Sequence, residues 1–149
     1  MRCALAKARA VAGATGTELP VLGADTTVVC ADRMLGKPTG EADAVAMLTA
    51  LSGRTHQVCT AIALVQGERA ASAVVTTAVT FRTLTADECR AYWRSGEPVD
   101  KAGGYALQGL GGAFVTRVEG SCSAVVGLPL AETYTLLREF GVAMGLTEA

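Results

Sequence analysis

A carboxylate placed inside an apolar strand is the first feature of this sequence that could do chemistry. Asp25 interrupts the β-branched stretch 21–30 and is followed directly by Thr26. A buried and unpaired carboxylate is costly, so Asp25 must either contact a cation or lie at an open site. Oxygen ligands from an aspartate and a threonine suit a divalent metal ion, whose bound water can act as a nucleophile. An aspartate that pairs with Lys or Arg only for structural reasons is the alternative.

Two glycine-containing loops carry polar side chains that could complement this carboxylate. Lys37 lies in the loop 36–40, but Ala31 and Pro38 stand where a Walker A phosphate loop needs Gly and Ser or Thr. A solvated surface lysine is the simpler interpretation of Lys37, and a phosphate contact the alternative. Gln108 lies among several glycines, and its amide offers a donor and an acceptor, which can read a nucleobase edge. A glycine-rich surface loop is the alternative there.

Histidine and cysteine usage excludes other common sites. His56 is the single histidine, which excludes a multi-histidine zinc site. A nucleophilic Ser52 activated by His56 is a weak possibility, and a histidine with a purely structural role is the alternative. The five cysteines are too far apart for a zinc-type pair, and a dispersed, odd set indicates a reducing cytoplasm. They are Cys3, Cys30, Cys59, Cys89 and Cys122.

These residues need secondary structure to position them. Apolar residues at helical spacing predict helices, and runs rich in Val, Ile and Thr predict strands. The expected helices are 1–12, 41–51, 86–94 and 130–140, and the expected strands are 21–30, 56–65, 73–82 and 113–119. This order implies one mixed α/β domain over 1–149, with parallel and antiparallel strand neighbours. The glycine-rich segment 100–112 is expected to be a loop, and 120–123 a turn.

The composition fits a folded globular domain and argues against several partners. The chain has 149 residues, of which 50% are hydrophobic, and a formal net charge of −1, so it is not disordered. Near-neutral charge and an aromatic content of 5% argue against nucleic-acid binding. The apolar runs are too short for a membrane helix, and Lys7 and Arg9 interrupt any signal-peptide core.

Six short blocks occur in an order that resembles one known family over nearly the whole chain. The blocks are 23–26 (GADT), 35–38 (LGKP), 51–56 (LSGRTH), 96–103 (GEPVDKAG), 108–111 (QGLG) and 125–130 (VVGLPL). In this order they resemble the Maf family of nucleoside triphosphate pyrophosphatases, first named for an effect on septum formation. Asp-Lys-Ala-Gly followed by Gln-Gly resembles the branch that acts on dTTP and UTP.

The resemblance implies a mixed-sheet fold of the Maf and inosine-triphosphatase type and a role for five residues. It makes Asp25 the general base or metal-binding carboxylate, and it makes Thr26 and Gln108 the residues that select the base. Lys37 and Lys7 would hold the phosphates. The implied reaction converts dTTP, UTP or modified pyrimidine nucleotides to the monophosphate and pyrophosphate with Mg²⁺ or Mn²⁺. A homodimer without nucleic-acid or membrane partners is the expected state.

One part of the family pattern does not occur in this sequence. Family members begin with a strand and a Ser-x-Ser-Pro-Arg-Arg loop, followed by a metal-binding Glu, all before the position of Met1. We therefore expect the fold to lack the family's first strand and loop. The chain then either starts at an internal Met or is a catalytically impaired, nucleotide-binding regulator of septum formation.

Overall fold

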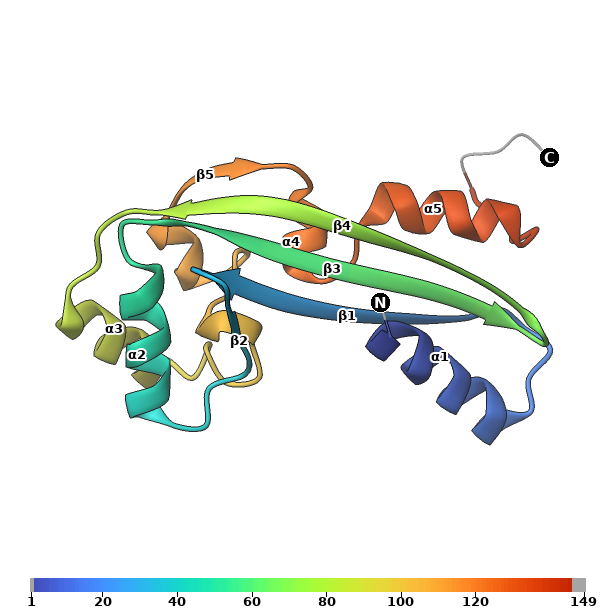
Figure 1. Ribbon diagram of the computed structural model, residues 1–149, viewed down its shortest axis with the longest axis horizontal. Coiled ribbons are helices and arrows are strands. Elements are labelled where there is room, and N and C mark those ends of the chain that lie inside the picture. Colours follow the sequence, from blue (N-terminus) through green and yellow to red (C-terminus); the bar gives the residue numbers. More distant parts are fainter. Residues whose placement is uncertain (1, 146–149) are drawn as a thin grey trace.

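A five-stranded antiparallel sheet is the centre of the computed structural model, which describes residues 2–145 (Figure 1). The strands are β1 Val21–Cys30, β2 Arg33–Leu35, β3 Thr55–Gln66, β4 Arg69–Phe81 and β5 Val115–Glu119, in the spatial order β2-β1-β3-β4-β5. Every strand pairing in this part of the chain is antiparallel, so the expectation of parallel neighbours is wrong. Two-residue turns reverse the chain after β1 and after β3, which produces hairpins where parallel pairs would need long crossovers.

Helices cover both faces of the long strands. They are α1 Arg2–Thr15, α2 Glu41–Leu51, α3 Ala86–Arg94, α4 Cys122–Val126 and α5 Leu130–Glu139, with short 3₁₀ helices η1 Ala102–Gly104 and η2 Leu110–Phe114. Side chains alternate across β3, so Ala61 and Ala63 pack against α1 while Ile62 and Leu64 pack beneath α5. Figure 1 shows α1 and α5 on opposite sides of the same end of the sheet.

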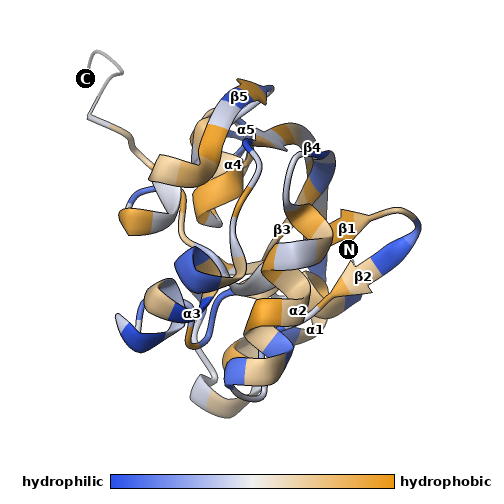
Figure 2. Ribbon diagram, turned by 90° about the vertical axis from the view of Figure 1, so that its left-hand side faces the viewer, coloured by the Kyte–Doolittle hydropathy of each residue, from blue (hydrophilic) through white to orange (hydrophobic). Residues whose placement is uncertain are grey.

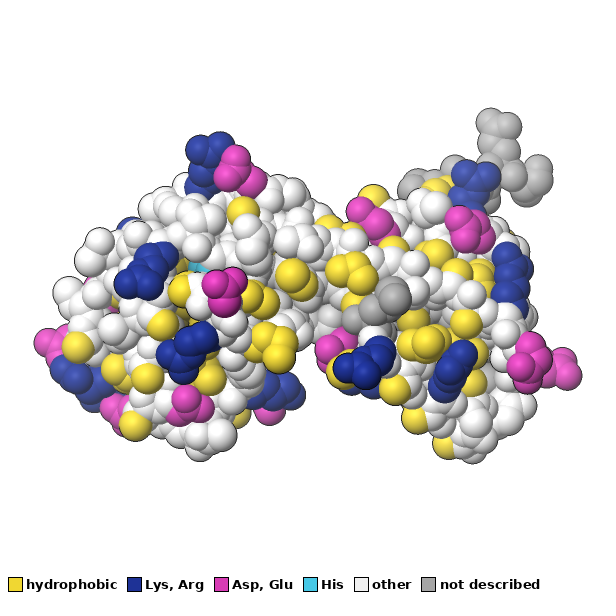
Figure 3. Space-filling view, in the orientation of Figure 1, with side chains coloured by type: hydrophobic (Ala, Val, Ile, Leu, Met, Phe, Trp, Pro, Cys, Tyr) yellow, Lys and Arg dark blue, Asp and Glu magenta, His cyan; other side chains and the backbone are white. Residues whose placement is uncertain are grey.

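The apolar core is divided into separate clusters along these strands. The larger cluster joins α2 and α3 to the sheet through Leu48, Leu51, Tyr92, Phe81 and Phe114, among other side chains. A smaller cluster lies beneath α5, around Leu136 and Phe140. The molecule is narrow between these two ends (Figure 3), and the polar turn between β1 and β2 projects away from the apolar strands (Figure 2).

Helix α1 approaches β1 at a position where only glycine fits. Gly23 is buried, and a Cβ atom added there would overlap the carbonyl oxygen of Ala4 and lie 2.9 Å from the backbone nitrogen of Ala8. Both alanines are almost completely buried. This close approach brings the next turn of α1, which carries Lys7, to the strand residue Asp25.

Most of the expected elements are confirmed. The strand 21–30 and the helices 41–51 and 86–94 have the predicted bounds, and Thr85 forms a capping box with Glu88. The hairpin strands are longer than expected, and the strand expected over 113–119 begins at Val115. The turn expected over 120–123 is partly helical, because Ser121 caps α4. Met1 of the first expected helix lies outside the described residues.

The helices were also compared with the length that a bilayer requires. Within residues 2–145, none is long and apolar enough to cross a membrane.

Candidate active site

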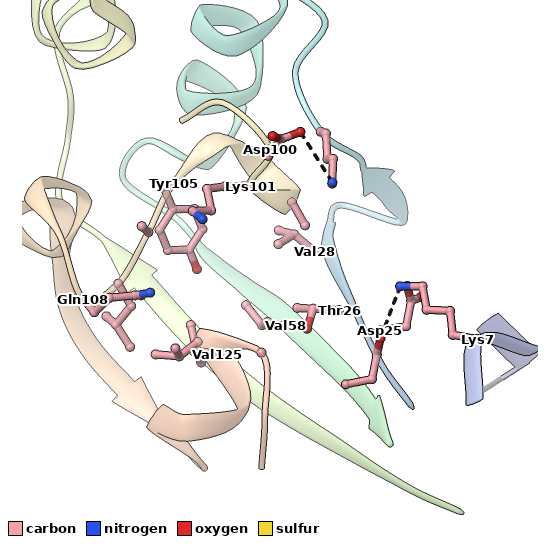
Figure 4. A pocket seen from close by; sticks show the side chains of 17 residues that line it. Lys7, Asp25, Thr26, Val28, Val58, Asp100, Lys101, Tyr105, Gln108 and Val125 are labelled. Atoms are coloured by element: carbon pink, nitrogen blue, oxygen red, sulfur yellow. Dashed lines mark hydrogen bonds and ion pairs between the residues drawn. The ribbon is translucent and has the colours of Figure 1, made fainter. Parts of the chain in front are cut away.

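A pocket of about 270 Å³ opens where β1 has a free edge. β2 pairs with β1 only at residues 28–30, which leaves the preceding part of β1 without a neighbour on that side. The pocket is lined by this edge, by the segment that precedes η2 and by the end of α4. The five residues given a role by resemblance all line it, although three come from distant segments (Figure 4). They are Lys7, Asp25, Thr26, Lys37 and Gln108.

The carboxylate in the strand is paired and still accessible. Lys7 Nζ lies 2.7 Å from Asp25 Oδ1 and also donates to the carbonyl oxygen of Ala24 at 3.2 Å. The Asp25 side chain is 28% exposed, so the pair lies at the mouth of the pocket. The structural ion pair and the open site, which the sequence left as alternatives, therefore occur together. One oxygen of Asp25 is held by the lysine, and the carboxylate remains accessible from the pocket.

A second lysine is paired only weakly. Lys37 Nζ lies 3.6 Å from Asp100 Oδ1, and both side chains are largely exposed. An exposed ion pair of this kind contributes at most about 1 kcal/mol, so a phosphate group can replace Asp100 at small cost. Asp100 itself has a left-handed backbone conformation, with φ of 67°.

Three residues of the pocket were not among the site residues predicted from the sequence. Lys101, Asp100 and Tyr105 also line the pocket. The Asp-Lys pair inside the glycine-rich segment was the available signal, although charged side chains in such a loop are usually solvated. With Lys101, the pocket contains three lysines and two aspartates, an excess of positive charge that favours a polyanionic ligand.

The half-buried carboxylate of Glu97 holds the backbone of the segment that carries Gln108. Glu97 accepts hydrogen bonds from the backbone nitrogen atoms of Leu110 at 2.8 Å and Gly111 at 3.0 Å. It also accepts one from Tyr92 Oη at 2.6 Å. Burial alone would raise the pKa of Glu97, but these hydrogen bonds together lower it, so Glu97 remains ionised and keeps its acceptors available.

The same tyrosine holds the other end of the segment. Tyr92 Oη accepts a hydrogen bond from the backbone nitrogen of Ala106 at 3.0 Å. Burial and the neighbouring Glu97 raise the pKa of Tyr92, so its hydroxyl stays protonated and continues to donate. Gln108 therefore lies between two anchored positions, and this limits the range of places its amide can occupy.

A buried histidine supports the floor of the pocket. His56 is 2% exposed, and its Nε2 atom lies 2.8 Å from Oη of Tyr105. Ser52 does not contact this histidine, because its hydroxyl hydrogen-bonds with the backbone of Leu84. Burial lowers the pKa of His56 to about 4. The weak nucleophilic pairing of Ser52 with His56 is therefore wrong, and the structural interpretation of the histidine is the better one.

His56 makes the stability of the fold depend on pH. Its pKa is about 4 in the folded protein and 6.5 when solvated, so below pH 6.5 the unfolded chain binds a proton that the folded chain rejects. We expect the free energy of unfolding to fall by about 3 kcal/mol between pH 7.5 and pH 4 from this group. His56→Gln should lose that part of the slope. Urea unfolding of both proteins across this range measures it, and parallel curves would contradict the assignment.

The carboxylates of the pocket are too few for a metal site made by protein alone. Among the described residues, no group of three or more His, Cys, Asp or Glu side chains could hold a metal ion. Magnesium commonly binds through one or two carboxylates together with substrate phosphates. Asp25 at the pocket edge, 28% exposed, is a single accessible carboxylate of the kind that this mode requires.

Comparison with known proteins gives consistent matches. The family model described as "Maf-like protein" matches residues 1–140. A protein of Vibrio parahaemolyticus named dTTP/UTP pyrophosphatase is 56% identical over 140 residues, which cover 94% of this chain and 74% of the relative. Proteins of the same name from Pseudoalteromonas translucida and Escherichia coli O157:H7 are 54% and 53% identical, over 93% and 94% of this chain and 74% and 71% of their own lengths.

Proposed function

Because the chain belongs to the Maf family, we propose that it is a nucleoside triphosphate pyrophosphatase that hydrolyses dTTP and UTP to the monophosphate and pyrophosphate. The observation that carries this proposal is that Lys7, Asp25, Lys37 and Gln108 converge on one pocket from four separate segments. Relatives at 53–56% identity carry the name dTTP/UTP pyrophosphatase, which supports the same substrates here.

In the proposed mechanism, Asp25 acts at the α-phosphorus. Its carboxylate orients a water molecule and accepts a proton as the water attacks, and pyrophosphate leaves from the opposite side. Lys7 holds the other carboxylate oxygen at 2.7 Å and orients Asp25. Lys37 exchanges Asp100 for phosphate oxygens, and its charge stabilises the negative charge of the leaving pyrophosphate.

A divalent cation, Mg²⁺ or Mn²⁺, is part of this proposal. Asp25 would hold it together with the triphosphate oxygens. When bound, the ion would offset negative charge on the phosphates as they separate. The lysines of the pocket would bind the remaining oxygens of the triphosphate.

The space between Thr26 and Gln108 would bind the base. Thr26 lies beside Asp25 in β1, and Gln108 faces it across the cavity (Figure 4). The Gln108 amide offers a donor that can hold O4 of uracil and thymine. We propose that these two residues select the base.

The test is pyrophosphate release from a panel of eight nucleoside triphosphates with Mg²⁺ or Mn²⁺. We expect dTTP and UTP to be the preferred substrates and the monophosphate to be the second product. Release of single phosphates, or a preference for purine nucleotides, would contradict the proposal. Tight nucleotide binding without turnover would instead support a non-catalytic regulator.

Gln108→Glu should change the substrate ranking. The substitution removes the amide donor and places a negative charge near the base, so kcat/KM for dTTP and UTP should fall by about tenfold or more relative to the other triphosphates. Gln66→Glu on the solvent-facing end of β3 is the matched control, because its amide contacts only the carbonyl oxygen of Glu18. If the ranking is the same in both variants, Gln108 does not contact the base.

We further propose a homodimer that acts in the cytoplasm, without nucleic-acid or membrane partners. The five cysteines are free thiols, which is compatible with a reducing compartment. The near-neutral charge disfavours nucleic acid and anionic lipid. Sedimentation of the purified chain measures the oligomeric state directly.

A further inference from the structure

Two threonines beside the pocket form a hydrogen-bonded chain whose direction is fixed. Thr26 of β1 and Thr60 of β3 are register partners, and their Oγ1 atoms are 2.9 Å apart. Thr60 Oγ1 also lies 2.6 Å from the carbonyl oxygen of Ala124 in α4. A carbonyl oxygen can only accept, so Thr60 donates its single hydroxyl proton to Ala124. The hydroxyl of Thr26 must then donate to Thr60.

Burial makes this direction hard to change. Thr60 is completely buried, so it has no access to bulk solvent, and breaking its bond to Ala124 would leave a polar group unsatisfied. Thr26 is only half-buried and lines the pocket. Because a hydroxyl has one proton, and Thr26 commits its proton to Thr60, only lone pairs of Thr26 remain to face a ligand.

The glutamine across the pocket has no such restriction. An amide carries a donor and an acceptor, and rotation about its last bond exchanges them. Among the described residues, no hydrogen bond fixes the orientation of the Gln108 amide. Gln108 can therefore match O4 of uracil with its donor or the 4-amino group of cytosine with its acceptor. A second residue of fixed polarity is needed to tell these bases apart.

We propose that Thr60 is a positioning residue that makes Thr26 an obligate acceptor, so that the pocket recognises the N3–H group of uracil and thymine and disfavours cytosine. Cytosine has a lone pair at N3 in place of that proton, and it would meet the lone pairs of Thr26. This inference rests on the proposed function and adds the atomic basis of its pyrimidine selectivity. Thr60 touches no substrate and acts only through Thr26.

Thr60→Val keeps the shape of the side chain and removes the hydroxyl. The Thr26 proton then loses its acceptor and can turn toward the pocket, where N3 of cytosine can accept it. The ratio of kcat/KM for UTP over CTP should fall by about tenfold or more. Thr60→Ser retains the hydroxyl and should restore the ratio, which a purely steric role of the methyl group would not do.

Thr77→Val is the matched control. Thr77 is equally buried in the neighbouring strand β4, and its hydroxyl hydrogen-bonds with the backbone of Ser121 without lining the pocket. Loss of the Thr77 hydroxyl should reduce stability, because it leaves buried backbone groups of Ser121 unpaired. It should leave the ratio of kcat/KM for UTP over CTP unchanged. A fall in the rates for UTP and CTP by an equal factor in Thr60→Val would assign Thr60 a structural role and overturn the inference.

The wild-type protein provides a test that needs no variant to fold. N3-methyl-UTP lacks the N3 proton, and we expect its kcat/KM to be at least about tenfold below that of UTP. Equal use of the two nucleotides would overturn the inference. Absence of pyrophosphate release from UTP itself would contradict the proposed function and the inference together, whereas an active Thr60→Val protein with an unchanged ratio contradicts the inference alone.

Discussion

Asp25→Asn should reduce dTTP and UTP hydrolysis by about 10³-fold, the largest effect expected from any single substitution in this protein. The amide keeps the shape of the side chain but is neither a base nor a charged ligand. The Lys7–Asp25 pair is partly exposed, so its loss should change the free energy of unfolding by no more than about 1 kcal/mol. Initial rates of pyrophosphate release and thermal unfolding, measured on the same preparation, separate the two effects.

Asp87→Asn serves as the control for the change from Asp to Asn. Asp87 lies on the surface of α3, where it pairs only with Arg90 in the following turn. This variant should hydrolyse dTTP at the wild-type rate. The catalytic assignment is wrong if Asp25→Asn also does so. A variant that still binds the nucleotide but releases no pyrophosphate would place Asp25 in the chemical step.

Gly23→Ala should lower both stability and activity although residue 23 does not line the pocket. The added methyl group would overlap the carbonyl oxygen of Ala4 and crowd Ala8, so helix α1 must move away from the sheet. Overpacking of this kind costs about 1–3 kcal/mol. The movement also carries Lys7 away from Asp25, and misplacement of a catalytic group by about 1 Å can reduce the rate by about 10²-fold. Chemical denaturation and kcat measure the two losses.

Gly13→Ala tests the same chemical change in the same helix. Gly13 is exposed, and a Cβ atom there would contact nothing within 4 Å. Gly13→Ala should raise the free energy of unfolding by about 0.5–1 kcal/mol, because alanine favours the helix, and it should leave kcat unchanged. If Gly23→Ala behaves like Gly13→Ala, the close contact between α1 and β1 does not position Lys7.

Local sequence patterns were sufficient to predict several elements. The β-branched run of β1 and the apolar spacing of α2 predicted their exact bounds, and Asp25 was conspicuous because a carboxylate does not suit a strand interior. The antiparallel hairpin of β3 and β4 was predicted, but the expected parallel neighbours were wrong, because the direction of the other strands depends on connections that periodicity does not describe. The short helix α4 was also missed, since its stability comes from the Ser121 cap and its packing on the sheet.

The composition of the pocket was harder to predict than its individual residues. Lys7 could be assigned a role by resemblance, but its contact with Asp25, 18 residues away, depends on the packing of α1 over Gly23. Lys101 was overlooked because a charged residue in a glycine-rich loop is usually solvated. The link from Thr26 through Thr60 to Ala124 joins three distant segments, and only the folded sheet brings them together.

The alanine surface of α1 makes Lys7 part of a weakly anchored element. Ala4 and Ala8 are the fully enclosed side chains of this helix, and each contributes little apolar area to the interface with the sheet. Amide hydrogens of α1 should therefore exchange with solvent through local openings, whereas those of central strand β3 exchange only on global unfolding. On the proposed role of Lys7, each such opening should suspend activity reversibly, because it separates Lys7 from Asp25. The temperature at which activity disappears is then set by the detachment of one helix, below the melting temperature of the sheet.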